Sequence, residues 1–271
     1  VLVNWFGVSR EKLNGTIPQN ILMSFYIGAA VFFIAVMYTI VKSKEYPPSE
    51  NSNINQESKG SIFTEITDSI KNMPVQMKRL ALVNFLTWPG LFLMWFYYST
   101  GVASSIFGGD PITNSDRYTE GLEYANATSA ILNLVTFAFS FTIPFWVSKL
   151  GKKWTHSICL LLGGLGLISV HYVDNPSWLY LSMGMVGIAW ASILSMPYSL
   201  LAGVIPQEKM GIYMGVFNFF IVLPEIIAAL TFGKIMENYL GNDRLLAVLI
   251  GGVLLLSAAV VCLLFVRERK S

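Results

Sequence analysis

Seven apolar stretches, each long enough to cross a lipid bilayer, constrain this chain more than any other feature of its sequence. A helix that rises about 1.5 Å per residue needs about 20 apolar residues to span about 30 Å of hydrocarbon. Hydrocarbon offers the backbone no hydrogen-bond partners, so each stretch is expected to be a helix. The sequence therefore predicts an all-α polytopic membrane protein. The seven predicted spans are Ile21–Val41, Leu80–Thr100, Ala125–Val147, Trp154–Val173, Trp178–Leu201, Ile212–Phe232 and Leu245–Val266.

The low charge content of the chain separates it from soluble proteins. Only 13% of its 271 residues are charged, whereas a soluble domain carries about 25%. The net charge of +2 provides no global field to attract nucleic acid, so no nucleic-acid partner is expected. Cys159 and Cys262 both lie inside apolar runs. They are expected to be small core residues, not a disulfide or metal ligands.

The basic residues predict the orientation in the membrane. Of the 18 Lys and Arg residues, 13 fall on the side of the C-terminus and 5 on the side of the N-terminus, if the seven spans alternate in direction. The positive-inside rule then places the N-terminus outside and the C-terminus in the cytoplasm, and the inner cell membrane is the expected location. The chain begins at Val1 and shows no signal peptide, so we expect a segment of a longer protein.

A long linker divides the predicted spans into one and six. Its first part, Ser43–Gly60, is rich in Ser, Asn, Glu and Pro and is expected to be flexible. Its second part, residues 61–73, places apolar residues on one stripe and predicts an amphipathic helix lying on the inner membrane face. The alternative is a solvated helix packed on the protein. The stripe consists of Ile62, Phe63, Ile66, Ile70 and Met73.

This division gives five predicted segments. They are an extracellular segment over residues 1–20, a single helix over 21–41, a cytoplasmic linker over 42–79, a six-helix bundle over 80–266 and a cytoplasmic tail over 267–271.

Glu225 is the only acidic or basic residue well inside any span. A charge at the centre of a span costs about 2.5 to 3.5 kcal/mol, so such a residue usually faces a cavity and often binds protons or ions. Asn218 lies seven residues earlier on nearly the same helix face, and Pro224 leaves the Phe220 carbonyl without its helical donor. The alternatives are a protonated Glu225 hydrogen-bonded between helices and a Glu225 close enough to the outer boundary to meet water.

Polar and aromatic residues in other spans suit a neutral polyol. Asn84 and Trp88 lie one turn apart, and Trp190 lies in a later span. Amides and indoles offer hydrogen bonds and an apolar face without a charge, as a sugar requires. The alternative for the tryptophans is packing against lipid or core.

A polar stripe in the span over 125–147 faces either a hydrated pathway or a neighbouring helix. In the same span, Pro144 frees the Ser140 carbonyl. The stripe consists of Asn126, Ser129, Asn133, Thr136 and Ser140.

The sequence lacks the usual signatures of an enzyme. It shows no nucleophile with a base, no zinc-ligand cluster and no phosphate-binding loop, and neither a cofactor nor a metal is expected. His156 and His171 lie near opposite ends of one span and do not suggest a metal pair. The glycines within the spans fit close helix packing and flexible gating better than dinucleotide binding.

Two cytoplasmic loops carry a more specific signal. PFWVSKLGKKWTH, Pro144–His156, resembles the second-half loop motif of the major facilitator superfamily. Ser195–Ala229, with its SMPYSLLAGVIPQEK run, resembles the sucrose and maltose type sugar:proton symporters of that superfamily, in particular bacterial members. GGDP at Gly108–Pro111 and GGLGLISVHYVDNP at Gly163–Pro176 resemble the same group.

This resemblance implies the last helix of an N-terminal bundle followed by a complete C-terminal bundle of a twelve-helix transporter. It implies proton-coupled import of a disaccharide or glycoside by alternating access, with the five missing N-terminal helices needed for function. Lys149, Lys152 and Lys153 match the loop motif, whose implied role is to secure one conformation. The candidate cavity residues are Asn84, Trp88, Asn133, Trp190, Asn218 and Glu225.

Two questions stay open at this point. The position of Glu225 resembles one that is often filled by Gln in this family, and the resemblance therefore makes Glu225 a candidate for sugar hydrogen bonding as well as for proton coupling. Seven spans with an external N-terminus also fit a receptor or photoreceptor, although no span holds a lysine for a retinal Schiff base. A non-transporting paralogue or partner subunit is the remaining alternative.

Overall fold

The computed structural model describes residues 7, 12–13, 17–43, 62–113, 115–205 and 209–268. The chain divides into two compact units, residues 1–59 and 60–271, and each is described by itself. Linker residues 44–60, tail residues 269–271 and most of the predicted extracellular segment 1–20 lie outside the described residues.

The first unit holds one long helix, α2 (Gln19–Lys42). It follows two strands of two residues each, β1 (Lys12–Leu13) and β2 (Ile17–Pro18), which pair antiparallel. Side chains on every side of α2 are apolar and exposed. A helix that is apolar all round and has no packed face is typical of a membrane span, so α2 matches the predicted span Ile21–Val41.

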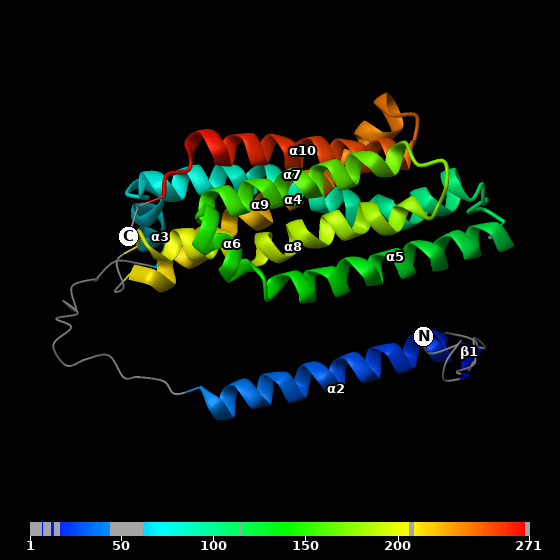
Figure 1. Cartoon of the computed structure of the whole chain (residues 1–271), viewed down its shortest axis with the longest axis horizontal. Coiled ribbons are helices and arrows are strands. Elements are labelled where there is room, and N and C mark those ends of the chain that lie inside the picture. Colours follow the sequence, from blue (N-terminus) through cyan, green and yellow to red (C-terminus); the bar gives the residue numbers. More distant parts are fainter. Residues whose placement is uncertain are drawn as a thin grey trace. The chain divides into compact units, whose positions relative to one another are not determined.

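In the second unit, every regular element of the described residues is a helix (Figure 1). Across the described residues, six helices are long and apolar enough to cross a membrane, and a seventh span results if α5 and α6 count as one bent pair. An all-α polytopic membrane protein is therefore confirmed. The elements of this unit are α3 (Ile62–Lys71), α4 (Val75–Gly101), the π-helix η1 (Val102–Ile106), α5 (Asp116–Ser140), α6 (Ile143–Leu150), α7 (Lys152–His171), α8 (Trp178–Ala202), α9 (Met210–Tyr239) and α10 (Arg244–Phe265).

The predicted span Ala125–Val147 departs from a single straight helix. α5 ends at Ser140, and α6 begins at Ile143 at an angle of 58° to it. Pro144 lacks the N–H that would bond the Ser140 carbonyl, and its ring clashes with that carbonyl in a continuous helix. The same proline is well accommodated in the first turn of α6, where no intrahelical donor is needed.

The predicted amphipathic helix is present as α3. Its C-terminal end contacts α9, because the Tyr213 hydroxyl donates to the Asn72 carbonyl at 3.4 Å and Met73 is buried. Ile70 is largely exposed. The side chains of residues 62–66 lie outside the described set, and the position of α3 on the membrane face stays a prediction.

Two pairs of glycines set how closely the helices of the bundle cross. The helices α9, α4, α10, α7, α8 and α5 each pack on the next in that order. A Cβ on Gly90 of α4 would lie 2.7 Å from the carbonyl oxygen of Gly251 in α10. A Cβ on Gly164 of α7 would lie 2.8 Å from the carbonyl oxygen of Gly252. Only glycine permits such close backbone contact at these crossings, as the sequence predicts for a membrane bundle.

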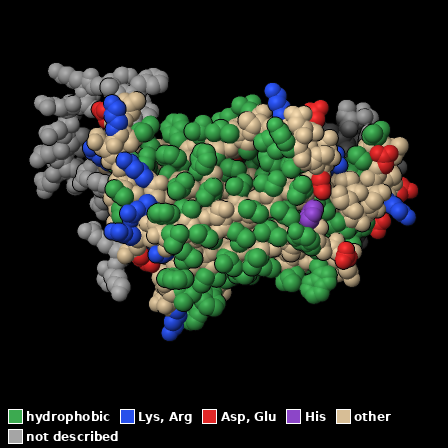
Figure 2. Space-filling view, turned by 90° about the horizontal axis from the view of Figure 1, so that it is seen from above, with side chains coloured by type: hydrophobic (Ala, Val, Ile, Leu, Met, Phe, Trp, Pro, Cys, Tyr) green, Lys and Arg blue, Asp and Glu red, His purple; other side chains and the backbone are tan. Residues whose placement is uncertain are grey.

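Charge is distributed unevenly between the two ends of the bundle. Figure 2 shows Lys and Arg side chains gathered mainly at one end and most Asp and Glu side chains at the other, with a largely apolar surface between them. The basic end includes Lys71, Lys78, Lys149, Lys152 and Arg267. A wide apolar belt with charge confined to its ends fits a helix bundle that spans a bilayer.

The GGDP sequence forms a fixed turn at the end of the bundle opposite the basic one. The Ile112 N–H and the Thr113 hydroxyl both donate to the Asp110 carboxylate, at 2.9 Å each. These donors lower the pKa of Asp110 below its ordinary value, with the Ile112 N–H contributing most. Ser115 then caps α5 by accepting the Tyr118 N–H. This turn fixes where α5 starts relative to α4.

Candidate functional site

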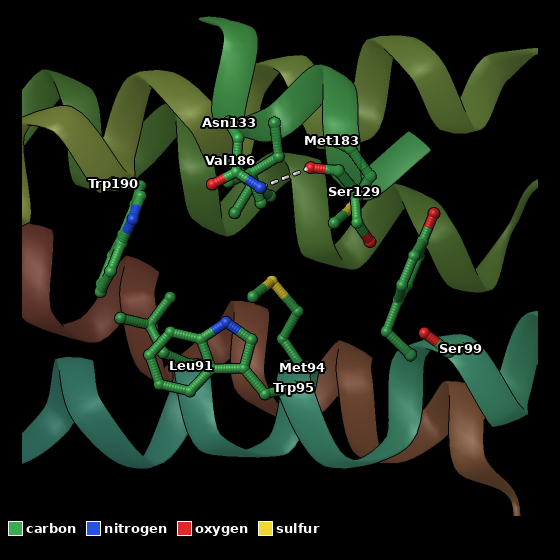
Figure 3. Close-up of a pocket in the computed structure, with 11 residues that line it drawn as sticks. Leu91, Met94, Trp95, Ser99, Ser129, Asn133, Met183, Val186 and Trp190 are labelled. Carbon is green, nitrogen blue, oxygen red and sulfur yellow. Dashed lines mark hydrogen bonds between the residues drawn. The ribbon is translucent and has the colours of Figure 1, made fainter. Parts of the chain in front are cut away.

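A cavity of about 310 Å³ lies between α4, α5 and α8 (Figure 3). Helical spacing brings its walls together. Leu91, Met94, Trp95, Tyr98 and Ser99 lie on one side of α4, and Met183, Val186 and Trp190 lie on one side of α8. Successive residues in each set are mostly three or four apart, so their side chains share a face. Ser129, Leu132 and Asn133 complete the lining from α5.

Three tryptophans form one side of this cavity and its surroundings. The ring centroids of Trp95 and Trp190 are 5.4 Å apart, and those of Trp88 and Trp190 are 5.9 Å apart, both edge to face. Trp88 and Trp95 are 6.4 Å apart. Edge-to-face contacts hold aromatic rings in fixed orientations. Trp95 is 51% exposed and lines the cavity, so a ligand there can contact it.

Polar groups enter the cavity from α5. The Asn133 side-chain amide donates to the Ser129 carbonyl at 3.1 Å, which orients the amide beside the cavity. Figure 3 shows Asn133 and Ser129 across the cavity from Leu91 and Trp95 of α4. Among the described lining residues there is no Asp, Glu, Lys or Arg. The cavity therefore combines apolar aromatic surface with neutral hydrogen-bonding groups.

Other hydroxyls of α5 are used to hold the helices together. Thr128 is fully buried, and its hydroxyl lies 2.6 Å from the Tyr98 hydroxyl of α4. The Thr136 hydroxyl donates to the Gly187 carbonyl of α8 at 2.9 Å. Residues of the predicted polar stripe therefore have different roles. Ser129 and Asn133 line the cavity, whereas Thr136 donates a hydrogen bond to a neighbouring helix.

The six residues predicted to line a substrate cavity do not all lie in one place. Trp88, Asn133 and Trp190 lie in or beside the cavity. Asn84 is only 2% exposed, buried in α4 one turn before Trp88. Asn218 accepts a hydrogen bond from the Tyr198 hydroxyl of α8 at 3.2 Å.

Glu225 lies two turns beyond Asn218 and is half-buried on α9. The cavity lining includes neither of these two α9 residues.

Trp95 is the largest of several cavity residues that the sequence does not mark as candidates. It stands in FLMWFYYSTG, where aromatic residues are so frequent that none is distinctive. Its spacing of seven residues from Trp88 indicates that both indoles lie on one helix face, and this is the sequence feature that could identify it.

The predicted loop motif forms a junction with the C-terminal segment. The Glu268 carboxylate accepts the backbone N–H groups of Lys152 at 2.8 Å and Lys153 at 3.3 Å. It thereby satisfies free donors at the N-terminus of α7, where a negative charge is favoured. The Lys152 ammonium group donates to the Ser199 carbonyl near the end of α8 at 3.2 Å. The loop thus connects α7, α8 and the segment after α10.

Two neighbours of this junction complete it. Gly151 has φ +83° and ψ 163°, a conformation that is essentially restricted to glycine. A Cβ there would also lie 2.5 Å from a carboxylate oxygen of Glu268. Gln76 at the start of α4 donates to the Arg267 carbonyl at 2.5 Å and accepts its N–H at 3.1 Å. Lys149 is exposed at the end of α6.

A buried polar contact joins α7 and α8 close to this junction. His156 Nδ1 is 2.8 Å from the Ser192 hydroxyl, joining α7 to α8. Cys159 and Cys262 are buried and free nearby, as expected for small core residues. No group of three or more His, Cys, Asp or Glu residues suited to a metal ion occurs in the described part of the chain.

Comparison with known proteins gives one family match. The sequence profile of the Major Facilitator Superfamily matches residues 3–229. The chain is 23% identical over 288 residues to the sucrose transport protein SUT1 of Oryza sativa subsp. japonica, covering 92% of this chain and 53% of that protein. It is 22% identical to the sucrose transport protein SUT5 of Oryza sativa subsp. indica, covering 98% of this chain and 55% of that protein.

A third relative is the sucrose transport protein SUC3 of Arabidopsis thaliana, which is 24% identical over 249 residues, covering 81% of this chain and 42% of that protein. The chain spans about half the length of the curated relatives it matches. The superfamily match covers most of the chain and overturns the receptor alternative. The chain belongs to the Major Facilitator Superfamily and is a membrane protein of a transporter family, not an enzyme.

Proposed function

We propose that this chain forms part of a transporter that carries a disaccharide or glycoside across the cell membrane together with a proton. The observation that carries the proposal is the cavity between α4, α5 and α8, whose described lining residues offer indole surface and neutral polar groups but no charged side chain. The similarity to plant sucrose transport proteins supports the choice of sugar.

The chemistry of the cavity suits a sugar ring. A pyranose presents an apolar C–H face that packs on an indole and an edge of hydroxyls that need hydrogen-bond partners. Trp95 and Trp190 supply the surface, and Asn133 with Ser129 supplies the polar partners. A charged substrate would lack a counter-ion here and would lose its hydration without compensation.

The transport cycle proposed here is alternating access. Transporters of this type bind substrate near the midplane and rock one helical bundle against another. We assign residues 80–266 to one such bundle and residues 21–41 to the last helix of the other. Residues 42–79 act as the cytoplasmic linker between them, and residues 267–271 form the tail.

Glu225 is proposed to couple proton movement to sugar movement. Tyr198, about one turn before the end of α8, donates a hydrogen bond to Asn218, about two turns into α9. Trp190 lies eight residues back along α8, and Glu225 lies seven residues forward along α9. These separations correspond to about 12 Å and about 10 Å along the two helices. Glu225 thus lies at nearly the same membrane depth as the cavity, where binding or release of a proton can respond to an occupied site.

Asn218 is proposed as a secondary substrate contact, and Asn84, which is only 2% exposed, as a residue that positions Trp88. Asn218 with Tyr198 marks a position closer to the basic end of the bundle, along the route by which a sugar would leave the cavity. Asn84 supports Trp88 from the adjacent turn of α4. Both roles are weaker than those of the residues that line the cavity.

The basic end of the bundle is proposed to face the cytoplasm. Thirteen of 18 Lys and Arg residues fall on that side in the sequence, and the positive-inside rule then places the N-terminus outside. The junction of Lys152 and Lys153 with Glu268 would lie on the cytoplasmic face. We propose that it holds the bundle rigid while the two halves move.

The test is sucrose uptake and sucrose-driven proton uptake in cells expressing the complete protein that contains this chain. Glu225→Gln is expected to bind sucrose but to lose sucrose-driven proton uptake. Glu237→Gln, near the end of the same helix, is the matched control and is expected to keep both. Unchanged proton uptake in Glu225→Gln would contradict the coupling role, and sucrose binding without any uptake in the unmodified protein would identify a non-transporting paralogue.

A further inference from the structure

A second cavity lies on the side of α8 away from the sugar site. It has a volume of about 620 Å³ and runs as a groove between α7 and α8 at the end of the bundle opposite the basic one. On α8, Leu181 and Met185 line this groove, whereas Met183 and Val186 line the sugar cavity. Because adjacent positions on a helix point in different directions, the two cavities open to different sides.

The walls of the groove are apolar and open to the surroundings of the bundle. Leu165 of α7 is 43% exposed and Leu181 of α8 is 56% exposed. Both helices are long and apolar enough to cross a membrane, so their exposed faces meet lipid acyl chains. Ile168 and Met185 continue the same walls.

The polar groups deep in the groove already have partners. The hydroxyls of Ser169 and Ser182 lie 2.7 Å apart. Each hydroxyl has one proton, so one of the two donates to the other, and the remaining proton goes to a backbone carbonyl, from Ser169 to Gly166 at 2.7 Å or from Ser182 to Trp178 at 3.2 Å. A ligand in this part of the groove has no hydrogen bond to satisfy, which favours a hydrocarbon chain over a sugar.

The mouth of the groove carries a different chemistry. Asp174 is the only charged residue among the described residues that line the groove, and it is exposed. Tyr172 and Trp178 stand on either side of it in sequence, with largely exposed rings. Such rings favour the level of lipid headgroups. A carboxylate that shares a groove lining with two exposed aromatic rings attracts an ammonium group and disfavours an anionic headgroup.

We propose that the groove between α7 and α8 binds a phospholipid with an amine headgroup, whose acyl chain lies between Leu165 and Leu181 and whose ammonium group lies beside Asp174. Phosphatidylethanolamine is the simplest lipid with this chemistry. The proposal is independent of the sugar site, because it uses a different side of α8.

The test is native mass spectrometry of the purified full chain with phosphatidylethanolamine, phosphatidylglycerol or a sterol added, the two phospholipids having identical acyl chains. Phosphatidylethanolamine is expected to bind roughly two- to fivefold more tightly than phosphatidylglycerol. Asp174→Asn should remove this preference, whereas Glu237→Gln should keep it. Equal binding of the two phospholipids by the unmodified chain, or displacement of phosphatidylethanolamine by the sterol, would overturn the proposal.

A second variant pair locates the lipid. Leu181→Trp fills the groove and is expected to reduce binding of both phospholipids. Leu134→Trp, at a leucine of α5 that is 61% exposed and outside the groove, is the matched control and should leave binding unchanged. Thermal unfolding in detergent shows that each variant is folded. If Leu181→Trp and Leu134→Trp are both folded and bind the phospholipids equally well, the groove is not the lipid-binding site.

Discussion

At the scale of single residues, Trp95 has the largest expected effect on sugar binding. Its ring is held edge to face by Trp190 but remains half exposed at the cavity. Trp95→Ala removes this surface and is expected to weaken sucrose binding roughly two- to tenfold, whereas Trp95→Phe keeps part of it. Equilibrium binding to the purified protein measures the change.

The control for this prediction is Trp154→Ala, which removes an equally exposed indole from α7 outside the cavity. Its sucrose affinity should match that of the unmodified protein. Equal loss of affinity in Trp154→Ala and Trp95→Ala would mean that the cavity does not explain the effect.

The buried pair Tyr98 and Thr128 is expected to stabilise the contact of α4 with α5. Thr128→Val leaves the Tyr98 hydroxyl buried without this partner, which lies at 2.6 Å in the folded protein. The free energy of unfolding is expected to fall by about 1 to 3 kcal/mol. Tyr98→Phe with Thr128→Val should cost less than the sum of the two single changes, because both lose the same bond. Denaturant unfolding measures these changes. If the loss of unfolding free energy in the double variant equals the sum of the losses in the two single variants, the hydrogen bond between Tyr98 and Thr128 does not stabilise the protein.

At the scale of helices, the junction at the start of α7 depends on Gly151. Alanine there must adopt φ +83° with ψ 163°, and its Cβ would approach the Glu268 carboxylate. Gly151→Ala is expected to lower the free energy of unfolding by about 1 to 3 kcal/mol.

Gly203→Ala is the control for this change. Gly203 follows α8 with a negative φ, and a Cβ there meets nothing within 4 Å. Its substitution should leave stability nearly unchanged. A Gly151→Ala protein as stable as the Gly203→Ala protein would show that the junction does not need this backbone conformation.

The sequence predicts the helices better than the contacts between them. Each predicted span overlaps an observed helix, because length and hydropathy suffice to identify a membrane span. Pro144 marks the position of the bend between α5 and α6, but not its angle. The hydrogen bonds of Glu268 with Lys152 and Lys153 join residues more than 100 positions apart, and no local pattern indicates such a pair.

For the candidate site, too, the sequence predicts residue types and helix faces but not how the helices pack. Trp88 and Trp190 were singled out by residue type and do meet. Helical periodicity shows which residues share a face, but not which face borders a cavity. Asn84 shares α4 with Trp95, yet one is buried in the core and the other lines the cavity.

At the scale of the whole molecule, the bundle combines three surfaces with separate roles. One side of α4, α5 and α8 encloses the proposed sugar cavity, another side of α8 forms the proposed lipid groove, and the basic end holds the junction at α7. Close glycine crossings keep α4, α7 and α10 in contact behind the cavity. This arrangement suits a bundle that moves as a rigid body in a transport cycle.

The central claim is that sugar occupies the cavity between α4, α5 and α8, and protection of an introduced thiol tests it most directly. Ser99→Cys places a thiol in the cavity lining, and Ser148→Cys places one on the exposed surface of α6. The native Cys159 and Cys262 are buried and should react slowly with maleimide. Sucrose is expected to slow labelling of Ser99→Cys and to leave Ser148→Cys unaffected, whereas equal labelling of Ser99→Cys with and without saturating sucrose would contradict the account.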